Sequence, residues 1–391
     1  MAQYTGGESI RRKNQQQNKS MQTVKKPIVR RVPVDFTLLF VVLTLMLFGV
    51  VMIFSASYYT TMTREAYNYD MFYYLKRQSG WVVFGLAAMT IAVNIPYVVW
   101  RRFSVLMYWT SNIILVMLPF IGIERGGQKR WIGITDSMSF QPSEFTKLAL
   151  AVFLSHYIII HREDLKNIKG FAVAAFFVVL PVGLIAMTNF SSALLVLLMG
   201  ATILFVGSPK IWYFFAALGA AIPLGAIAIA LQPYRLSRIY IWFDPWLDPQ
   251  GDGFQTIQGL YAVASGGLFG LGLGQSRQKT FVPESHNDII FAIICEELGI
   301  VGAALVIVLF GVLIWRGIKV AMKAKDAFGT LLATGITSVI AFQAIINIGV
   351  VTNTIPNTGQ PLPFISYGGT SLLFLSVMMG ILLNISKYQK E

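Results

Sequence analysis

The feature that most constrains this chain is a series of long apolar runs. The first covers residues 36–57, and about 22 apolar residues are enough for a helix to cross the ~30 Å hydrocarbon core of a membrane. This run is also longer than the apolar core of a signal peptide. Nine further runs follow, at 80–98, 104–122, 143–160, 171–187, 191–207, 211–231, 288–315, 329–351 and 366–386. The sequence therefore predicts an all-α integral membrane protein with about ten transmembrane helices.

The distribution of positive charge supports this topology. Charged residues make up only 13% of the chain, about half the share of roughly 25% in soluble proteins. If the N-terminus is cytoplasmic, 20 of the 31 Lys and Arg residues fall in cytoplasmic segments and ten in outer segments, as the positive-inside rule requires. We therefore expect a basic, disordered cytoplasmic tail at 1–35, a cytoplasmic C-terminus at 387–391, and no nucleic-acid partner.

Residue content and motifs exclude several common types of site. The single Cys295 rules out a disulfide framework, and three scattered His residues rule out a zinc-finger array. The chain contains no GxxxxGK[ST] phosphate loop, no GxSxG elbow and no HExxH pair. Any catalysis must therefore use energy already stored in the substrate, for example in a lipid-linked diphosphate.

Two outer segments differ from ordinary connections. Residues 232–287 form a large extracellular loop between the seventh and eighth predicted helices, too long for a plain link and therefore functional in character. Residues 352–365 carry no charge but contain three prolines. The string GGLFGLGLG at 266–274 allows close backbone approach or a re-entrant turn. We expect the functional site to involve both segments.

Asp288 is the leading catalytic candidate. It stands in PESHND at the outer mouth of the eighth predicted helix, where a carboxylate meets water on one side and low dielectric on the other. One interpretation is a helix N-cap. The other is a general base held near a substrate hydroxyl. The two roles are compatible.

Charged residues also fall within the apolar runs. Glu144 and Lys147 are three apart and share one helical face, so they form either a structural salt bridge or part of a polar site in which Lys147 binds phosphate. On a helical wheel Glu296 lies about 80° from Asp288, and Glu297 about 180°. We therefore expect only Glu296 to share the cavity of Asp288.

A group of basic residues lies in the outer segments, against the positive-inside bias. A diphosphate is a natural counter-ion, because a guanidinium binds two of its oxygens at once. The alternative is a solvated rim paired with the acidic residues of the same loop. The group consists of Arg125, Lys129, Arg130, Arg235, Arg238, Arg277 and Lys279.

Glu284, His286 and Asp288 alternate along one loop. Their side chains offer donors that suit a divalent cation. Because alternate positions in a loop also occur without a metal, we assign no metal ligands. A divalent cation is the one cofactor that the sequence leaves open.

Six ordered strings together resemble the SEDS family, the shape, elongation, division and sporulation proteins. The resemblance covers 36–386, and the loop strings are more similar to the division and sporulation members than to the elongation member. The strings are KRWIGI at 129–134, FQPSEFTKLAL at 140–150, DPWLDPQGDGFQ at 244–255, QGLYAVASGGLFGLGLGQSRQK at 258–279, PESHNDIIFAIICEELG at 283–299 and PNTGQPLPFISYGGTSLL at 356–373.

The resemblance implies a peptidoglycan glycosyltransferase that polymerises lipid II at the outer face of the bacterial cytoplasmic membrane and releases undecaprenyl diphosphate. It also implies a class B penicillin-binding protein, a transpeptidase, as partner, together with other division proteins. The essential carboxylate of the family falls on Asp288, its intramembrane pair on Glu144 and Lys147, and its basic residue of the KRW string on Arg130. In one departure, Asn189 replaces an acidic residue found in many members.

These inferences give a catalytic role to Asp288 and substrate-binding roles to a wider group. Two alternative functions stay open: a flippase that transports lipid II, and a non-catalytic scaffold for the transpeptidase. The flippase needs polar residues along a path through the membrane, whereas these candidates collect towards the outer half. The expected substrate-binding residues are Lys129, Arg130, Glu144, Lys147, Arg235, Arg238, Glu284, His286 and Glu296.

Overall fold

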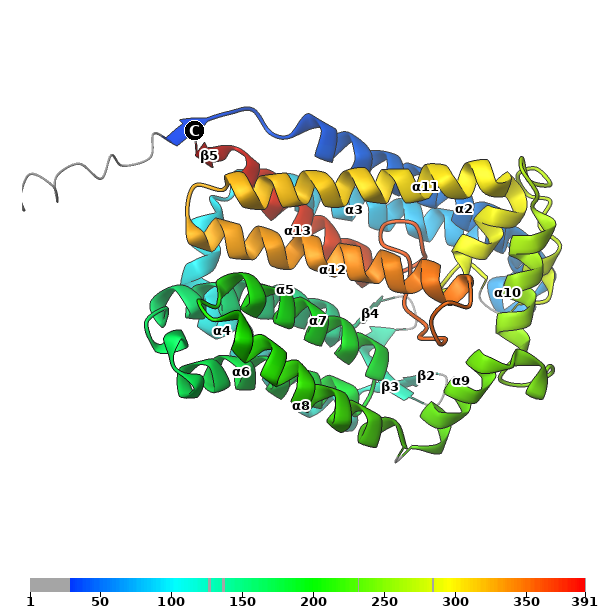
Figure 1. Ribbon diagram of the computed structural model, residues 1–391. Helices are drawn as coiled ribbons and strands as arrows, with labels where there is room; N and C mark the ends of the chain where they lie inside the picture. The colour runs from blue at the N-terminus through cyan, green and yellow to red at the C-terminus, as the bar shows by residue number, and fades with distance from the viewer. Residues whose placement is uncertain (1–28, 126–127, 136–137, 231, 283–284, 391) are drawn as a thin grey trace, which may run out of the picture.

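A bundle of long helices dominates the fold (Figure 1). The computed structural model describes residues 29–125, 128–135, 138–230, 232–282 and 285–390. Each predicted apolar run falls mainly on one long helix of this described part, although the run at 80–98 extends past the end of α3 at Asn94. The long helices are α2 (Phe36–Thr63), α3 (Tyr73–Asn94), α4 (Tyr97–Ile121), α5 (Pro142–Ile160), α6 (Ile168–Ala186), α7 (Phe190–Gly207), α8 (Ile211–Ala230), α11 (Ile290–Lys323), α12 (Ala327–Val351) and α13 (Gly369–Ser386).

Among the described residues, eight helices are long and apolar enough to cross a membrane: α2, α4, α5, α6, α7, α11, α12 and α13. Many of their outward side chains are large and apolar, as the 68% exposure of Phe40 and the 64% exposure of Leu106 illustrate. A helix can present such a surface to lipid because its backbone hydrogen bonds are satisfied internally. The prediction of a helical, multi-pass membrane protein is therefore confirmed, while the count of ten spans is not.

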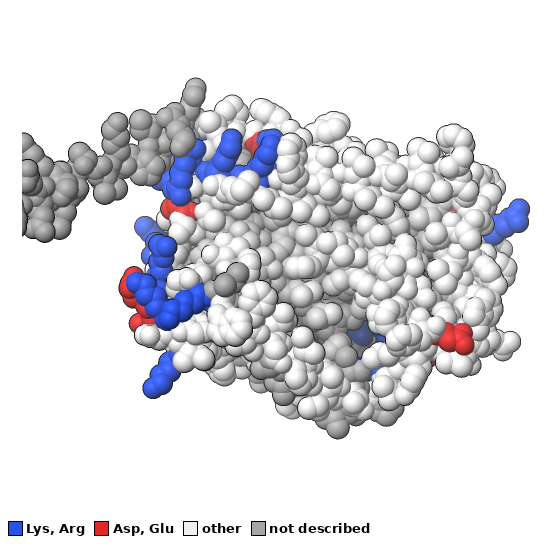
Figure 2. Space-filling view, viewed as in Figure 1, with Lys and Arg blue, Asp and Glu red and all other residues white. Residues whose placement is uncertain are grey.

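The described ends of the chain lie side by side. β1 (Val29–Arg31) pairs antiparallel with β5 (Tyr388–Lys390), and Asp35 caps α2 by accepting a hydrogen bond from the Leu38 backbone N–H at 3.0 Å. These contacts place residues 29–35 of the expected tail against the bundle, and residues 1–28 lie outside the described part. Lys and Arg residues gather at this end of the molecule (Figure 2).

The opposite end of the bundle carries the irregular elements (Figure 1). A small antiparallel sheet, which the all-α prediction missed, has the order β2-β3-β4. The large outer segment folds into two short helices and two 3-10 turns. The elements are β2 (Ile123–Arg125), β3 (Gln128–Thr135), β4 (Met138–Phe140), α9 (Pro233–Phe243), η3 (Pro245–Leu247), α10 (Phe254–Ser265) and η4 (Gln278–Thr280), besides η1 (Glu65–Tyr67) and η2 (Asp164–Lys166) elsewhere.

The glycine-rich string inserts into α11. Helix α11 is interrupted at Gly299, whose φ of 66° favours glycine. The freed backbone groups pair with the inserted segment: Leu271 N–H donates to Glu296 O at 2.9 Å, and Ile300 N–H donates to Gly267 O at 2.9 Å. The expected close backbone approach is confirmed. It fixes the outer segment against the helix that follows Asp288.

Candidate active site

A polar cavity of about 600 Å³ opens at the end of the bundle that carries the β-sheet and α9. Its walls come from the first turns of α3, α5, α7 and α13, from β3 and α9, from the turn before α11, and from residues 358–361. Helix N-termini present unpaired N–H groups and the positive end of the helix dipole. The cavity is therefore suited to an anionic, hydrogen-bonding ligand.

Asp288 lines this cavity from the turn before α11. The helix begins at Ile290, and its cap position is Ile289, which makes no side-chain capping bond. The Asp288 carboxylate instead accepts a hydrogen bond from Gln255 Nε2 at 3.2 Å. The backbone carbonyl of Asp288 accepts a second bond from Asn347 Nδ2 at 2.6 Å. The structure thus holds Asp288 from two sides, with its carboxylate at the cavity wall.

Glu144 and Lys147 form the expected ion pair, with 2.7 Å between Lys147 Nζ and Glu144 Oε1. Both side chains are almost fully buried. Glu144 lines the cavity and also accepts a hydrogen bond from Ser371 Oγ at 3.1 Å, whereas Lys147 does not line it. The pair therefore presents a carboxylate to the cavity and keeps the ammonium behind it.

Arginines from three elements line the cavity. Arg130 lies on β3 and donates from Nε to Thr188 O at 3.3 Å. Arg238 lies on α9 and donates to Asn357 O at 2.7 Å. Arg77 of α3, which the sequence analysis did not single out, is the third. A guanidinium has five donors, so these contacts do not exhaust its capacity for a ligand.

Two predicted basic residues lie apart from this cavity. Lys129 donates from Nζ to Pro119 O at 3.1 Å, and Arg235 donates to Ala186 O at 3.0 Å and lies over the Phe190 ring. Neither residue is part of the cavity wall. Because successive strand residues point to opposite faces, Lys129 and Arg130 cannot both point inward. A substrate-binding role for Lys129 or Arg235 therefore stays a prediction that this cavity does not support.

His286 lines the cavity while only 3% exposed. Burial lowers the pKa of His286 to about 4, so its ring is neutral near pH 7. The ring packs against Tyr74, with 4.0 Å between centroids. Glu284, its suggested neighbour in a cation site, lies outside the described residues. Among the residues that are described, no group of three His, Cys, Asp or Glu side chains is placed to hold a metal ion.

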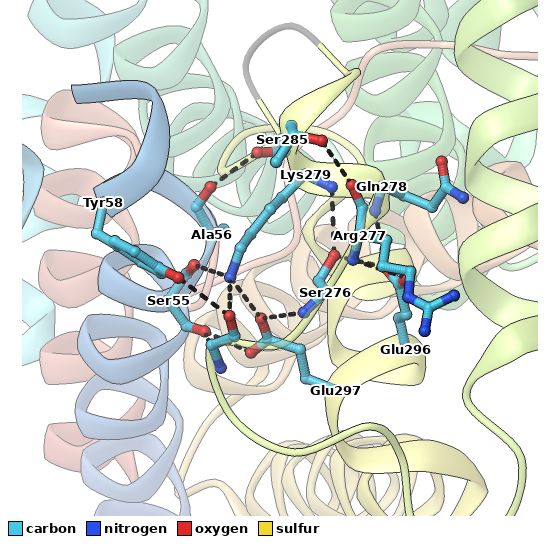
Figure 3. Close-up of polar contacts among 12 residues, drawn as sticks. Ser55, Ala56, Tyr58, Ser276, Arg277, Gln278, Lys279, Ser285, Glu296 and Glu297 are labelled. Carbon is cyan, nitrogen blue, oxygen red and sulfur yellow. Dashed lines mark hydrogen bonds and ion pairs between the residues drawn. The ribbon is translucent and has the colours of Figure 1, made fainter. Parts of the chain in front are cut away.

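Glu296 does not share the cavity of Asp288, which corrects the helical-wheel expectation. Its carboxylate accepts hydrogen bonds from Ser276 Oγ and from the Arg277 backbone N–H, the latter at 3.0 Å (Figure 3). The wheel fails because Asp288 lies in a turn before the helix begins at Ile290. Glu296 instead holds the inserted outer segment.

The expected position of Lys279 on a basic outer rim is also corrected, because this residue lies inside the protein. Its side chain is 2% exposed, and its Nζ lies 3.2 Å from Glu297 Oε1. The same Nζ donates to Gly274 O at 2.6 Å and to Ser55 O at 3.1 Å (Figure 3). Lys279 thus joins the outer segment to α2 and α11.

The sequence analysis missed amide side chains that brace the cavity. Gln343 and Asn347 are four apart on α12 and buried, and they donate to Pro361 O at 3.0 Å and to Gln360 O at 2.7 Å. Amides in an otherwise apolar run were the available signal, since buried polar groups need partners. No such signal marked Gln255, which stands in a polar loop string.

The fold and the site together define a class of membrane protein. It is a multi-pass helical bundle with a polar, arginine-lined cavity at one end, which is suited to polar or anionic headgroups. A model of the FtsW, RodA and SpoVE family, described as "Cell cycle protein", matches residues 36–391. The chain belongs to this family, and the resemblance seen in its sequence strings is confirmed.

Curated relatives and solved structures agree with this membership. The chain is 42% identical over 363 residues to Stage V sporulation protein E of Bacillus subtilis, covering 91% of this chain and 98% of that one. It is 37% identical over 372 residues to the "Probable peptidoglycan glycosyltransferase FtsW" of Trichlorobacter lovleyi, covering 94% and 96%.

Among solved structures, one described as "Structural coordination of polymerization and crosslinking by a peptidoglycan synthase complex" matches with a TM-score of 0.74 and 26% identity, over 90% of this chain and 97% of that one. The Rod shape determining protein RodA of Thermus thermophilus matches with a TM-score of 0.65 and 23% identity, over 90% and 96%. The second match shows the shared fold alone.

Proposed function

We propose that this protein is a peptidoglycan glycosyltransferase that polymerises lipid II into glycan strands during cell division or sporulation. The observation that carries the proposal is the Asp288 carboxylate in the wall of a cavity that Arg77, Arg130 and Arg238 also line. A base and a set of fixed cations are the two groups that glycosyl transfer from a diphosphate requires. The names of the FtsW relatives support the same activity.

In the proposed reaction, the acceptor lipid II places its GlcNAc 4-hydroxyl near Asp288. The carboxylate takes the hydroxyl proton as the oxygen attacks the anomeric carbon of the donor MurNAc. The new glycosidic bond forms as the bond from that carbon to phosphate breaks, and the electron pair leaves with undecaprenyl diphosphate. One direct displacement inverts the anomeric centre.

The departing diphosphate gains negative charge, and the arginines are placed to stabilise it. Arg130 and Arg238 are tethered by backbone carbonyls, so little reorganisation is needed when the charge develops. Lys147 is a weaker candidate for this role, since Glu144 neutralises it behind the cavity wall. We therefore assign the leaving group to the arginines and not to Lys147.

For the topology, we propose that the end with both described chain ends is cytoplasmic and that the cavity faces outward. The gathering of Lys and Arg at the first end supports this orientation through the positive-inside rule (Figure 2). We also propose a class B penicillin-binding protein and other divisome proteins as partners. Similarity to a peptidoglycan synthase complex supports a transpeptidase partner.

Lipid II polymerisation by the purified full-length protein tests the function. We expect Asp288→Asn to keep the fold and to abolish polymer, whereas Asp70→Asn should keep normal yield. Asp70 pairs with Lys76 at the surface, and its bond from the Phe72 backbone N–H can be kept by the amide oxygen of Asn. A normal polymer yield from Asp288→Asn would show that Asp288 is not the general base. Lipid II that crosses a liposome membrane without being polymerised would instead indicate a flippase, and a protein inactive in both assays would indicate a scaffold.

A further inference from the structure

A second, smaller pocket lies beside the main cavity. It has a volume of about 180 Å³, and its wall is mostly polar. The side chains that matter for its chemistry are Arg238, Trp242, Asp252, Gln255, Asn353 and Asn357. This pocket has room for one sugar-sized ring, and its polar wall does not suit a polyprenyl chain.

Gln255 forms the wall between this pocket and the reaction centre. It lines the small pocket, and its Nε2 donates to Asp288 Oδ1 at 3.2 Å. Arg238 lines both spaces. A ligand in the small pocket therefore lies immediately next to a substrate that contacts Asp288.

The wall of the small pocket is fixed before any ligand binds. Trp242 Nε1 donates to Asn353 O at 2.9 Å, and Asn353 Nδ2 donates back to Trp242 O at 3.3 Å. Asn357 Nδ2 donates to Gln255 Oε1 at 3.2 Å. Because these side chains are already ordered, binding does not require the entropy cost of ordering them.

The chemistry of this wall fits a carbohydrate. Sugar hydroxyls both donate and accept hydrogen bonds, which matches a wall that offers the Asp252 carboxylate together with amides and a guanidinium. A pyranose also has an apolar C–H face that packs on a flat aromatic ring, and Trp242 supplies such a ring. Because the Asp252 carboxylate offsets the charge of Arg238, the wall has no net positive charge, which favours a neutral sugar over a phosphate as the occupant.

We propose that this pocket is a saccharide subsite that holds one ring of the growing glycan strand, next to the sugar that reacts at Asp288. The inference rests on the proposed function, because it assumes that a glycan is present at this face. By holding the strand between additions, the subsite favours long products over short ones.

Direct binding tests the subsite without any turnover. The probe is a soluble GlcNAc–MurNAc tetrasaccharide, titrated against the full-length Asp288→Asn protein by calorimetry. In this background Trp242→Ala should weaken binding about tenfold through loss of the aromatic surface. The matched control is Trp246→Ala, which removes an exposed tryptophan outside the pocket. Equal affinity of the two variants would overturn the proposal.

A second variant keeps the proposal testable if Trp242→Ala fails to fold. Asp252→Asn keeps the side-chain size and should also weaken tetrasaccharide binding. Unchanged binding by Asp252→Asn would overturn the saccharide assignment.

Product length links the subsite to the reaction. In the active protein, Trp242→Ala should shorten the glycan products from lipid II, and Trp246→Ala should not. If the wild-type protein makes no polymer but still binds the tetrasaccharide through Trp242, the proposed function fails and the subsite stands. If polymer forms with equal length in both variants, the function stands and the subsite is wrong.

Discussion

Gln255 Nε2 lies 3.2 Å from Asp288 Oδ1, so an amide of α10 donates directly to the proposed catalytic base. The other end of the same amide accepts a hydrogen bond from Asn357 Nδ2 at 3.2 Å. A hydrogen bond donated to a carboxylate favours its ionised form, which is the form that accepts a proton. Gln255 is therefore a positioning residue for Asp288.

Gln255→Glu should move the pH dependence of polymerisation. The variant can still accept from Asn357, but it places a second carboxylate beside Asp288 and so raises the pKa at which Asp288 ionises. We expect the acidic limb of the kcat/KM profile to shift upward by about one pH unit or more, with activity recovering at high pH. Gln255→Leu, which adds no charge, should shift it less. An unchanged profile in Gln255→Glu would show that the amide has no influence on the base.

His286 gives the protein a second pH response, in stability. Burial lowers its pKa to about 4, whereas an unfolded His titrates near pH 6.5. Between these values the unfolded state binds more protons, so stability falls as the pH drops from about 6.5 to 4, by up to roughly 3 kcal/mol. Thermal unfolding in detergent at pH 7.5 and pH 5 should therefore show a smaller loss for His286→Gln than for the wild type. Identical pH dependence in both proteins would contradict this assignment.

Much of the fold was predictable because apolar run length reports membrane helices directly. The run at 143–160, for example, matches α5 at Pro142–Ile160. Asp288, Arg130 and Glu144, which line the cavity, could be singled out from the sequence because polar groups stand out in or near such runs. The partners of these residues were not, since Gln255 and Asn357 are 102 apart in sequence and meet only through the tertiary fold. Lys279 was misplaced for the same reason: a basic residue in a polar loop gives no sign that the loop folds inward.

The Lys279–Glu297 pair should contribute to stability and not to chemistry. Lys279→Met leaves the Glu297 carboxylate buried without its cationic partner, which typically costs about 3–5 kcal/mol. Adding Glu297→Gln should recover part of this loss, as a double-mutant cycle of unfolding free energies would reveal. The exposed Lys76–Asp70 pair is the control, and Lys76→Met should cost less than about 1 kcal/mol. Equal effects at the two sites would mean that the buried pair is not coupled to the fold.

The Glu144–Lys147 pair allows a sharper separation of structure from chemistry. Glu144→Gln alone leaves the Lys147 ammonium buried without its anionic partner, so we expect a loss of about 3–5 kcal/mol in stability. A loss of activity in this variant could then come from unfolding or from the chemistry. Combining Glu144→Gln with Lys147→Met removes both charges and should restore most of the stability. Because Glu144 lines the cavity and Lys147 does not, we expect the double variant to stay at least about tenfold less active per folded molecule, a loss of roughly 1.4 kcal/mol in transition-state binding. The measurements are thermal unfolding and lipid II polymerisation on the same preparation. If activity returns together with stability, the pair only stabilises the packing of α5 against its neighbours. The chemistry of the cavity would then depend on Asp288 and the arginines alone.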